Sequence, residues 1–322
     1  MTDTAVTSPT RSPAVLSEFV RRHRSKVALI IVILLIGAVT ASRSDVFLTP
    51  ANLRNVLVQS SIIGILAMGT TLLMVSGGID LSIGSAVSFA GVLIASWMAA
   101  GWSPVAAVAA GLLIAVLVGM TTGTLAAKST SHPFVVTLGM LTLLQGAALL
   151  ISQAPITDIP DSFLGLVDLK PWGIPLVVFV FAVVALAAHV VLSRTKFGRW
   201  LYAIGASPNA ARLSGIRVDL VKVAVYGVSG LLVGVSAVLL TSELTSAQPT
   251  MGAGLELSAI AAVAVGGTPL SGGRGDVLGS LLGVLLLALI GNSLNLLSIA
   301  SNWQYVLQGA VIIVAVMAQR EP

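Results

Sequence analysis

Apolar residues are gathered into ten runs along this chain of 322 residues, and polar residues are concentrated between them. Most of the runs reach the roughly 17–25 residues that a helix needs to cross the hydrocarbon of a bilayer. They are apolar on every side, whereas the strands of a β-barrel alternate in polarity. The pattern predicts an all-α, polytopic membrane helical bundle with about ten spans, over Val27–Ala41, Leu53–Val75, Leu81–Ala99, Pro104–Ala127, Phe134–Ile151, Ile174–Leu192, Val223–Thr241, Leu255–Val265, Val277–Leu297 and Trp303–Ala318.

Two glycine-rich breaks interrupt this pattern. GGIDLSIG at residues 77–84 and GGTPLSGG at residues 266–273 share the form GGxxLSxG. The second break follows Leu255–Val265, which is too short to cross a bilayer and is expected to be broken or re-entrant. A broken helix frees backbone groups that must face protein or a water-filled cavity. We therefore expect both breaks to border a permeation path, at the same end of their spans, so that any internal repeat is parallel rather than inverted.

Composition agrees with a membrane protein. Hydrophobic residues make up 56% of the chain and charged residues 9%, against roughly a quarter charged in soluble domains. Since Lys and Arg accumulate on the cytoplasmic side, an inside N-terminus places all of the 17 Lys and Arg inside except Arg43, Arg54 and Lys170. This predicts a multi-pass protein of the bacterial inner membrane with both termini cytoplasmic. It also explains the +5 net charge without a nucleic acid partner.

No polar stretch is long enough to form a soluble domain. We expect a disordered cytoplasmic tail over residues 1–25 and a single transmembrane domain over residues 26–322. The chain has no cysteine and only three scattered histidines, so we expect no metal site. No spaced set of nucleophile, base or paired carboxylates indicates catalysis.

Asp80, within the first break, and Glu256, at the start of the short run Leu255–Val265, are the two acidic candidates. A carboxylate inside the membrane is costly and usually functional. Asp80 has two interpretations: it caps the helix that follows, or it contacts a solute or ion. Polar residues inside the runs are mostly neutral amides, which suit a polyhydroxylated solute but also serve as contacts between helices. The candidates for the translocation path are Gly77, Gly78, Asp80, Ser82, Glu256, Asn292 and Asn295.

Two segments outside the runs are candidate surfaces for partners. The acidic stretch Gln153–Gly173 is either a solvated loop or a docking surface for a soluble extracytoplasmic partner, through Asp158, Asp161 and Asp168. The basic stretch Ser193–Lys222 has a helix start at Ser207-Pro208 and a helix end at Gly215. It fits either a groove in another protein or, through Arg194, Lys196, Arg199 and Trp200, an acidic lipid surface.

Three motifs in order carry a family resemblance: VSGGIDLSIGS, FGRWLYAIGASPNAARLSGI and AVGGTPLSGGRGDVLGSLLGVLLLALIGNSLNLL. From about Asn52 to the C-terminus the chain resembles the membrane permease subunit of binding-protein-dependent ABC importers, in the ribose and monosaccharide branch. The resemblance implies that the loop between the sixth and seventh spans docks on an ATPase subunit. The residues it assigns to this coupling role are Gly205, Ala206, Ser207, Asn209, Ala210, Ala211, Ser214 and Gly215.

The sequence contains no GxxxxGK[ST] phosphate loop, so we expect a transport subunit that is not itself an enzyme and binds no cofactor, with ATP and Mg used by a partner ATPase. The resemblance further implies a periplasmic or lipid-anchored sugar-binding protein, a second permease copy or paralogue, and membrane lipid as partners. The expected solute is a ribose-like pentose or related sugar; autoinducer-2, a sugar alcohol or a nucleoside are alternatives. A more distant alternative is an ion-coupled secondary transporter with Asp80 and Glu256 as ion carriers.

Overall fold

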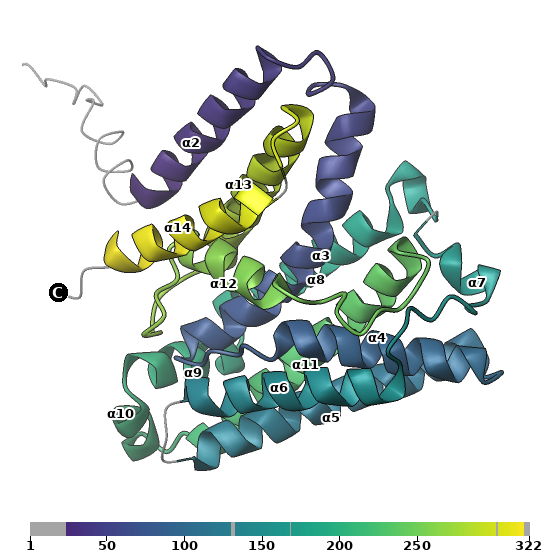
Figure 1. The fold of residues 1–322 in the computed structure, drawn as a ribbon. Helices are drawn as coiled ribbons and strands as arrows, with labels where there is room; N and C mark the ends of the chain where they lie inside the picture. Colours follow the sequence, from purple (N-terminus) through teal and green to yellow (C-terminus); the bar gives the residue numbers. More distant parts are fainter. Residues whose placement is uncertain (1–23, 130–132, 168, 301, 319–322) are drawn as a thin grey trace, which may run out of the picture.

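The computed structural model describes residues 24–129, 133–167, 169–300 and 302–318. These residues form helices and one isolated antiparallel bridge between Ile156 and Ala247, which confirms the all-α bundle (Figure 1). The tail expected over residues 1–25 lies outside the described residues up to residue 23. The helices are α2 (Arg24–Ala41), α3 (Pro50–Val75), α4 (Ile83–Ala99), α5 (Pro104–Lys128), α6 (Pro133–Ile151), α7 (Asp161–Leu164), the 3-10 turn η1 (Pro171–Gly173), α8 (Leu176–Arg194), α9 (Lys196–Ala206), α10 (Pro208–Leu213), α11 (Val218–Glu243), α12 (Leu255–Val265), α13 (Val277–Leu296) and α14 (Asn302–Ala318).

Each of the ten apolar runs is a helix, which makes the chain a multi-pass membrane protein. Six of these helices are long and apolar enough to cross a membrane: α3, α5, α6, α8, α11 and α13. The apolar parts of α2, α4 and α12 are shorter. Within the described residues, length and composition therefore establish six candidate spans, and the predicted count of ten is not confirmed.

Three helices begin with the same local signal, a hydroxyl residue followed by proline. Thr49, Ser103 and Ser207 each accept a hydrogen bond from the backbone N–H three residues later, at 3.3 Å in all three cases. The proline that follows supplies a φ angle suited to the first helical position and has no N–H to satisfy. These caps set the starts of α3, α5 and α10.

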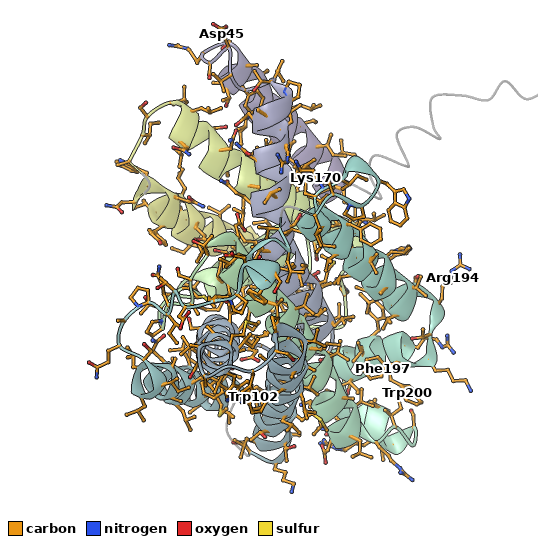
Figure 2. The ribbon with its side chains drawn as sticks, turned by 90° about the vertical axis from the view of Figure 1, so that its right-hand side faces the viewer. Asp45, Trp102, Lys170, Arg194, Phe197 and Trp200 are labelled. Carbon is orange, nitrogen blue, oxygen red and sulfur yellow. The ribbon has the colours of Figure 1, made fainter. Side chains whose placement is uncertain are left out.

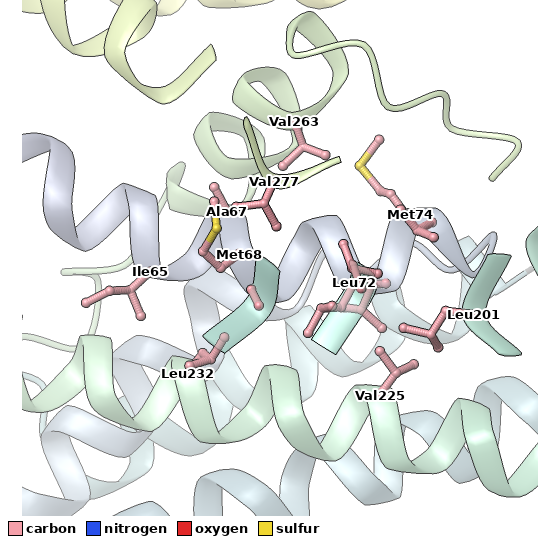
Figure 3. Close-up of a cluster of buried hydrophobic side chains, with 14 of the residues drawn as sticks. Ile65, Ala67, Met68, Leu72, Met74, Leu201, Val225, Leu232, Val263 and Val277 are labelled. Atoms are coloured by element: carbon pink, nitrogen blue, oxygen red, sulfur yellow. The ribbon is translucent and has the colours of Figure 1, made fainter. Parts of the chain in front are cut away.

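Helix α3 lies at the centre of the bundle. Its most apolar stretch is 78% buried, against 22% for those of α6 and α8, which identifies the latter two as peripheral. α3 packs against α8, α11, α12 and α13. α4, α5 and α6 pack against one another, and α11 packs against α4 and α5 (Figure 1). Figure 3 shows the core between these helices, with side chains of α3 facing Val225 and Leu232 of α11 and Val263 of α12.

Coupling segment and translocation path

The basic stretch 193–222 is helical along most of its length. α8 continues to Arg194, α9 occupies Lys196–Ala206, α10 occupies Pro208–Leu213, and α11 already begins at Val218. The short helix expected after Ser207 is confirmed. The loop expected before Ser207 is wrong, because Thr195 caps a further helix there: its hydroxyl accepts from the N–H of Gly198 at 3.1 Å.

Helix α9 is amphipathic. Gly198, Leu201 and Ile204 are buried on one face, and Leu201 joins the main core beside Leu72 and Val225 (Figure 3). The opposite face exposes Lys196, Arg199 and Trp200. Figure 2 shows Arg194 and Trp200 together on one flank of the molecule. The spacing of the buried residues, three and then three apart, is the sequence signal from which this helix could have been predicted.

Helix α10 presents a small exposed surface. Asn209 and Ala210 are exposed, whereas Ala211 is 4% exposed and belongs to the main core. Of the two alanines assigned to the coupling role, Ala210 is therefore on the exposed face of α10 and Ala211 is not, because successive residues of a helix point about 100° apart. Gly215 ends the helix with φ +82°, and the N–H of Ile216 donates to the carbonyl oxygen of Ala211 at 3.1 Å, as in a Schellman motif.

The end of α9 touches both glycine breaks. A methyl group at Gly205 would lie 2.0 Å from the carbonyl oxygen of Val75 and 2.3 Å from the backbone nitrogen of Gly273. The N–H of Gly273 donates to that same Val75 oxygen at 2.9 Å. A methyl group at Gly272 would lie 2.6 Å from the nitrogen of Gly77. The two breaks are thus neighbours at the α9–α10 end of the bundle, and we call this contact of Gly77, Gly205, Gly272 and Gly273 the glycine junction.

The two breaks have the same local geometry. Gly77 has φ +75° and Gly267 has φ +94°. The residue after each glycine donates back to the preceding helix: Gly78 N–H to the Leu73 oxygen at 2.9 Å, and Thr268 N–H to the Val263 oxygen at 3.2 Å. Gly77 and Gly267 are therefore the structurally equivalent residues. The shared pattern GGxxLSxG instead aligns Gly77 with Gly266, so the sequence and structural alignments differ by one residue. Both breaks lie at the same end of their helices, as expected for a parallel arrangement.

A tyrosine fastens α9 to the segment before α13. The Tyr202 hydroxyl donates to the carbonyl oxygen of Gly275 at 2.8 Å. Burial, and then the Asp276 carboxylate, raise the pKa of this hydroxyl. Tyr202 therefore remains protonated as a donor at physiological pH, and its hydrogen bond joins α9 to the segment before α13.

Asp80 stabilises the turn that precedes α4. Its Oδ1 accepts from the backbone N–H of Ser82 at 2.8 Å and from the Ser82 hydroxyl at 2.6 Å. Asp80 is 7% exposed, and the Tyr226 hydroxyl donates to the neighbouring Ile79 oxygen at 3.0 Å. This geometry favours the structural interpretation of Asp80, although the carboxylate orders the residue before the helix and not the first amides of α4 themselves.

Glu256 begins α12 and reaches the start of α4. Its Oε1 accepts from the Gly254 N–H at 3.2 Å, whereas its buried Oε2 has no hydrogen-bond partner among the described residues. A methyl group at Gly84 would lie 2.0 Å from Oε2. Gly84 is in the first turn of α4, where free amides and the helix dipole favour negative charge. The carboxylate therefore lies between two helix starts, α12 and α4.

The two predicted asparagines of α13 have different surroundings. Asn292 is 7% exposed and forms a reciprocal amide pair with Asn52 of α3, with N···O distances of 3.1 and 2.8 Å. This is a contact that joins two helices. Asn295, one turn later, is exposed and lines a cavity.

The acidic stretch lies at the opposite end of α11 from α10. The hydroxyl of Ser242, near the C-terminus of α11, donates to the Phe163 oxygen of α7 at 3.0 Å. The 26 residues of α11 separate the two ends by roughly 39 Å at 1.5 Å per residue, enough to cross a bilayer. Asp158 and Asp161 are exposed there, and Asp168 lies outside the described residues. Among those residues no group of three His, Cys, Asp or Glu is placed to hold a metal ion.

The bundle thus combines long apolar helices, two touching breaks and, at one end, the amphipathic helix α9 with the exposed helix α10. The chain belongs to the family described as "Branched-chain amino acid transport system / permease component", whose model matches residues 52–316. This is the permease component that the sequence motifs indicated.

Three relatives show how far the similarity extends. The Ribose import permease protein RbsC of Escherichia coli K12 is 38% identical over 93% of this chain and 94% of its own length. RbsC of Bacillus subtilis is 40% identical over 85% of this chain and 86% of its own length. The D-allose transport system permease protein AlsC of Escherichia coli K12 is 34% identical over 91% of this chain and 89% of its own length. No solved structure matches the chain.

Proposed function

We propose that this chain is the membrane-spanning subunit of an ATP-driven ABC importer that carries a monosaccharide, a ribose-like pentose or a related sugar, across the inner membrane. One observation carries the proposal: relatives named as ribose import permeases are similar over nearly the whole chain. The α9–α10 segment supports it, because it presents an exposed basic and small-residue surface at one end of the bundle.

The α9–α10 surface is where an ATPase subunit would dock. Asn209 and Ala210 are accessible on α10, and α9 contacts both breaks through the glycine junction. Closure of ATPase subunits on ATP and Mg, which this chain does not bind itself, would push on α10. That displacement would reach α3, α12 and α13 through the glycine junction, where backbone contacts backbone with no side chain between them.

The charge distribution supports a cytoplasmic α9–α10 end and cytoplasmic termini. A periplasmic or lipid-anchored sugar-binding protein would then meet the other end, where Asp158 and Asp161 are exposed. A second copy or paralogue of the permease would complete the path. The exposed apolar side chains of α5, α6 and α8 suit contact with lipid.

The family description names branched-chain amino acids, whereas the ribose and allose permeases reported above are named for sugars. Neutral amides and hydroxyls predominate among the polar residues of the spans. They match the hydroxyl groups of a sugar better than the two charges of an amino acid. Autoinducer-2, a sugar alcohol or a nucleoside would meet the same lining.

Purification of the tagged chain in mild detergent from its own cells tests this proposal. The expected result is co-purification of an ABC ATPase and a sugar-binding protein, with calorimetry on the latter showing ribose binding. Purification without an ATPase, together with uptake that follows an ion gradient, would support an ion-coupled transporter and overturn the proposal.

A further inference from the structure

A cavity of about 210 Å³ lies between α3, α12, α13 and α14. Four carboxamide side chains and one hydroxyl line it, from four helices that are distant in sequence: Gln59 of α3, Ser258 of α12, Asn295 of α13, and Gln304 and Gln308 of α14. We infer that this cavity is the point at which the permease holds the solute during passage, and that its ligand is a small, neutral, polyhydroxylated molecule. The inference rests on the proposed function and adds the residues that contact the solute.

The amides of this cavity are available for a ligand. Gln59, Asn295 and Gln304 are exposed, and with other described residues their side chains form no hydrogen bond. Gln308 is 9% exposed and donates to the Ser258 hydroxyl at 2.5 Å, which fixes the inner wall. The cavity thus has one ordered wall, formed by Gln308 and Ser258, and three side-chain amides that are free to bind a ligand.

Lipid is an unsuitable neighbour for these groups. A carboxamide without a hydrogen-bond partner in hydrocarbon costs several kcal/mol, and three lie together here. Most other exposed positions of α5, α6 and α8 are apolar, such as Leu113, Leu150 and Leu186. The exposed hydroxyls of Thr121 and Thr142 donate to carbonyl oxygens of their own helices. The cavity must therefore contain water or a polar solute, because only these can satisfy the amides.

Size and chemistry identify the class of ligand. A volume of about 210 Å³ holds several water molecules at roughly 30 Å³ each. Each carboxamide offers two N–H donors and one acceptor oxygen, the combination that pairs with hydroxyl groups, which both donate and accept. No charged side chain lines the cavity, so a neutral solute is favoured over an ion.

Packing around the cavity keeps the amides in place. Gly291 of α13 faces Gln304, and a methyl group there would lie 3.1 Å from its Nε2. One turn earlier and later on α13, Leu287 and Leu294 complete the wall. The nearby pair of Asn52 and Asn292 ties α3 to α13, so the two helices that carry Gln59 and Asn295 keep a fixed spacing.

Uptake by a triple variant tests the inference. Gln59→Met, Asn295→Leu and Gln304→Met together keep the side-chain volume and remove the free amides. In cells, the maximal rate of radiolabelled ribose uptake is expected to fall at least about tenfold, which corresponds to one or two net hydrogen bonds. The ribose concentration for half-maximal uptake should stay unchanged, because the binding protein sets it.

The matched control is Gln145→Met, the same change at a glutamine of α6 that donates to the Pro249 oxygen; it should keep the wild-type rate. Membrane abundance and co-purifying ATPase are measured for each variant. Normal abundance with wild-type uptake in the triple variant would overturn the inference while leaving the importer intact. If the unaltered protein takes up another neutral monosaccharide instead of ribose, the same comparison is made with that sugar. If it takes up none and no ATPase co-purifies, the proposed function fails instead.

Thiol labelling gives a second readout that does not depend on the rate. The chain has no cysteine, so Asn295→Cys introduces a single thiol. A membrane-impermeant, charged methanethiosulfonate reagent should modify it, and ribose with active turnover should slow the modification. Leu186→Cys, on the apolar outer face of α8, should stay unmodified. Absence of reaction at the thiol of the Asn295→Cys variant in the assembled importer would show that the cavity is dry and would contradict the inference.

Discussion

The backbone N–H of Gly273 donates to the carbonyl oxygen of Val75 at 2.9 Å. This single bond joins the break after α3 to the break after α12, although the two residues are far apart in the sequence. Gly205 of α9 packs directly on the same pair. The surface proposed for the ATPase is therefore in backbone contact with the segments proposed to border the path.

Gly205→Ala should destabilise the junction. The added methyl group would lie 2.0 Å from the Val75 oxygen, so backbone must move, and overpacking of this kind costs about 1–3 kcal/mol. Thermal unfolding of the purified protein in detergent should show a lower midpoint, together with reduced uptake. Gly146→Ala is the control, since no atom lies within 4 Å of its added methyl group. An unchanged midpoint for Gly205→Ala would refute the close packing.

Ala210→Arg should block coupling without unfolding the protein. Ala210 is exposed on α10, so the new side chain extends into solvent and obstructs only a docked partner. We expect loss of uptake and of co-purifying ATPase at normal membrane abundance, with Ala210→Ser close to wild type. Ala211→Arg, which would place a charge in the core, should instead reduce abundance. Full uptake by Ala210→Arg would count against docking at α10.

Asp80→Asn should preserve uptake. The carboxamide oxygen of Asn can still accept from the N–H and hydroxyl of Ser82, the two bonds that Asp80 forms now. Asp80→Ala removes both and leaves buried donors unpaired, at a cost of about 1–3 kcal/mol. Abundance and uptake are measured for both variants. Loss of uptake in Asp80→Asn at normal abundance would show that the carboxylate acts on the solute or on an ion.

Asp276 should contribute through two separable interactions. Its Oδ1 caps α13 by accepting from the Gly279 N–H at 2.8 Å, and its Oδ2 lies 2.6 Å from the Lys26 ammonium. Asn at this position keeps the cap, so Asp276→Asn and Lys26→Ala should each cost at most about 1 kcal/mol, because the pair is partly exposed. Asp276→Ala should cost about 1 kcal/mol more, the value of an N-cap. Equal unfolding midpoints for the Asn and Ala variants would exclude the cap.

Much of the helical framework could be predicted from the sequence, because uninterrupted apolar runs leave only a helix available in a membrane. The start of α10 followed from Ser207-Pro208 and its end from Gly215. The helix α9 was missed because its buried face, Gly198, Leu201 and Ile204, is short and interrupted by charges. The spacing of these residues and the cap at Thr195 were present in the sequence, but over 11 residues they are a weak signal beside the long apolar runs.

The contacts between distant segments could not be predicted. Nothing local in the sequence indicates that Gly205 fits against Val75 and Gly273, or that Asn292 pairs with Asn52 while Asn295 lines a cavity. The amides were visible as polar residues in apolar runs. Their gathering from α3, α13 and α14 into one cavity depends on helix packing, which no short motif encodes.

Uptake by proteoliposomes that contain this chain, its co-purifying ATPase and the binding protein tests the importer most directly. Radiolabelled ribose should accumulate only when ATP and Mg are present on the ATPase side, and an uncoupler should leave the rate unchanged. Accumulation without ATP that disappears when the proton or sodium gradient is dissipated would contradict the account.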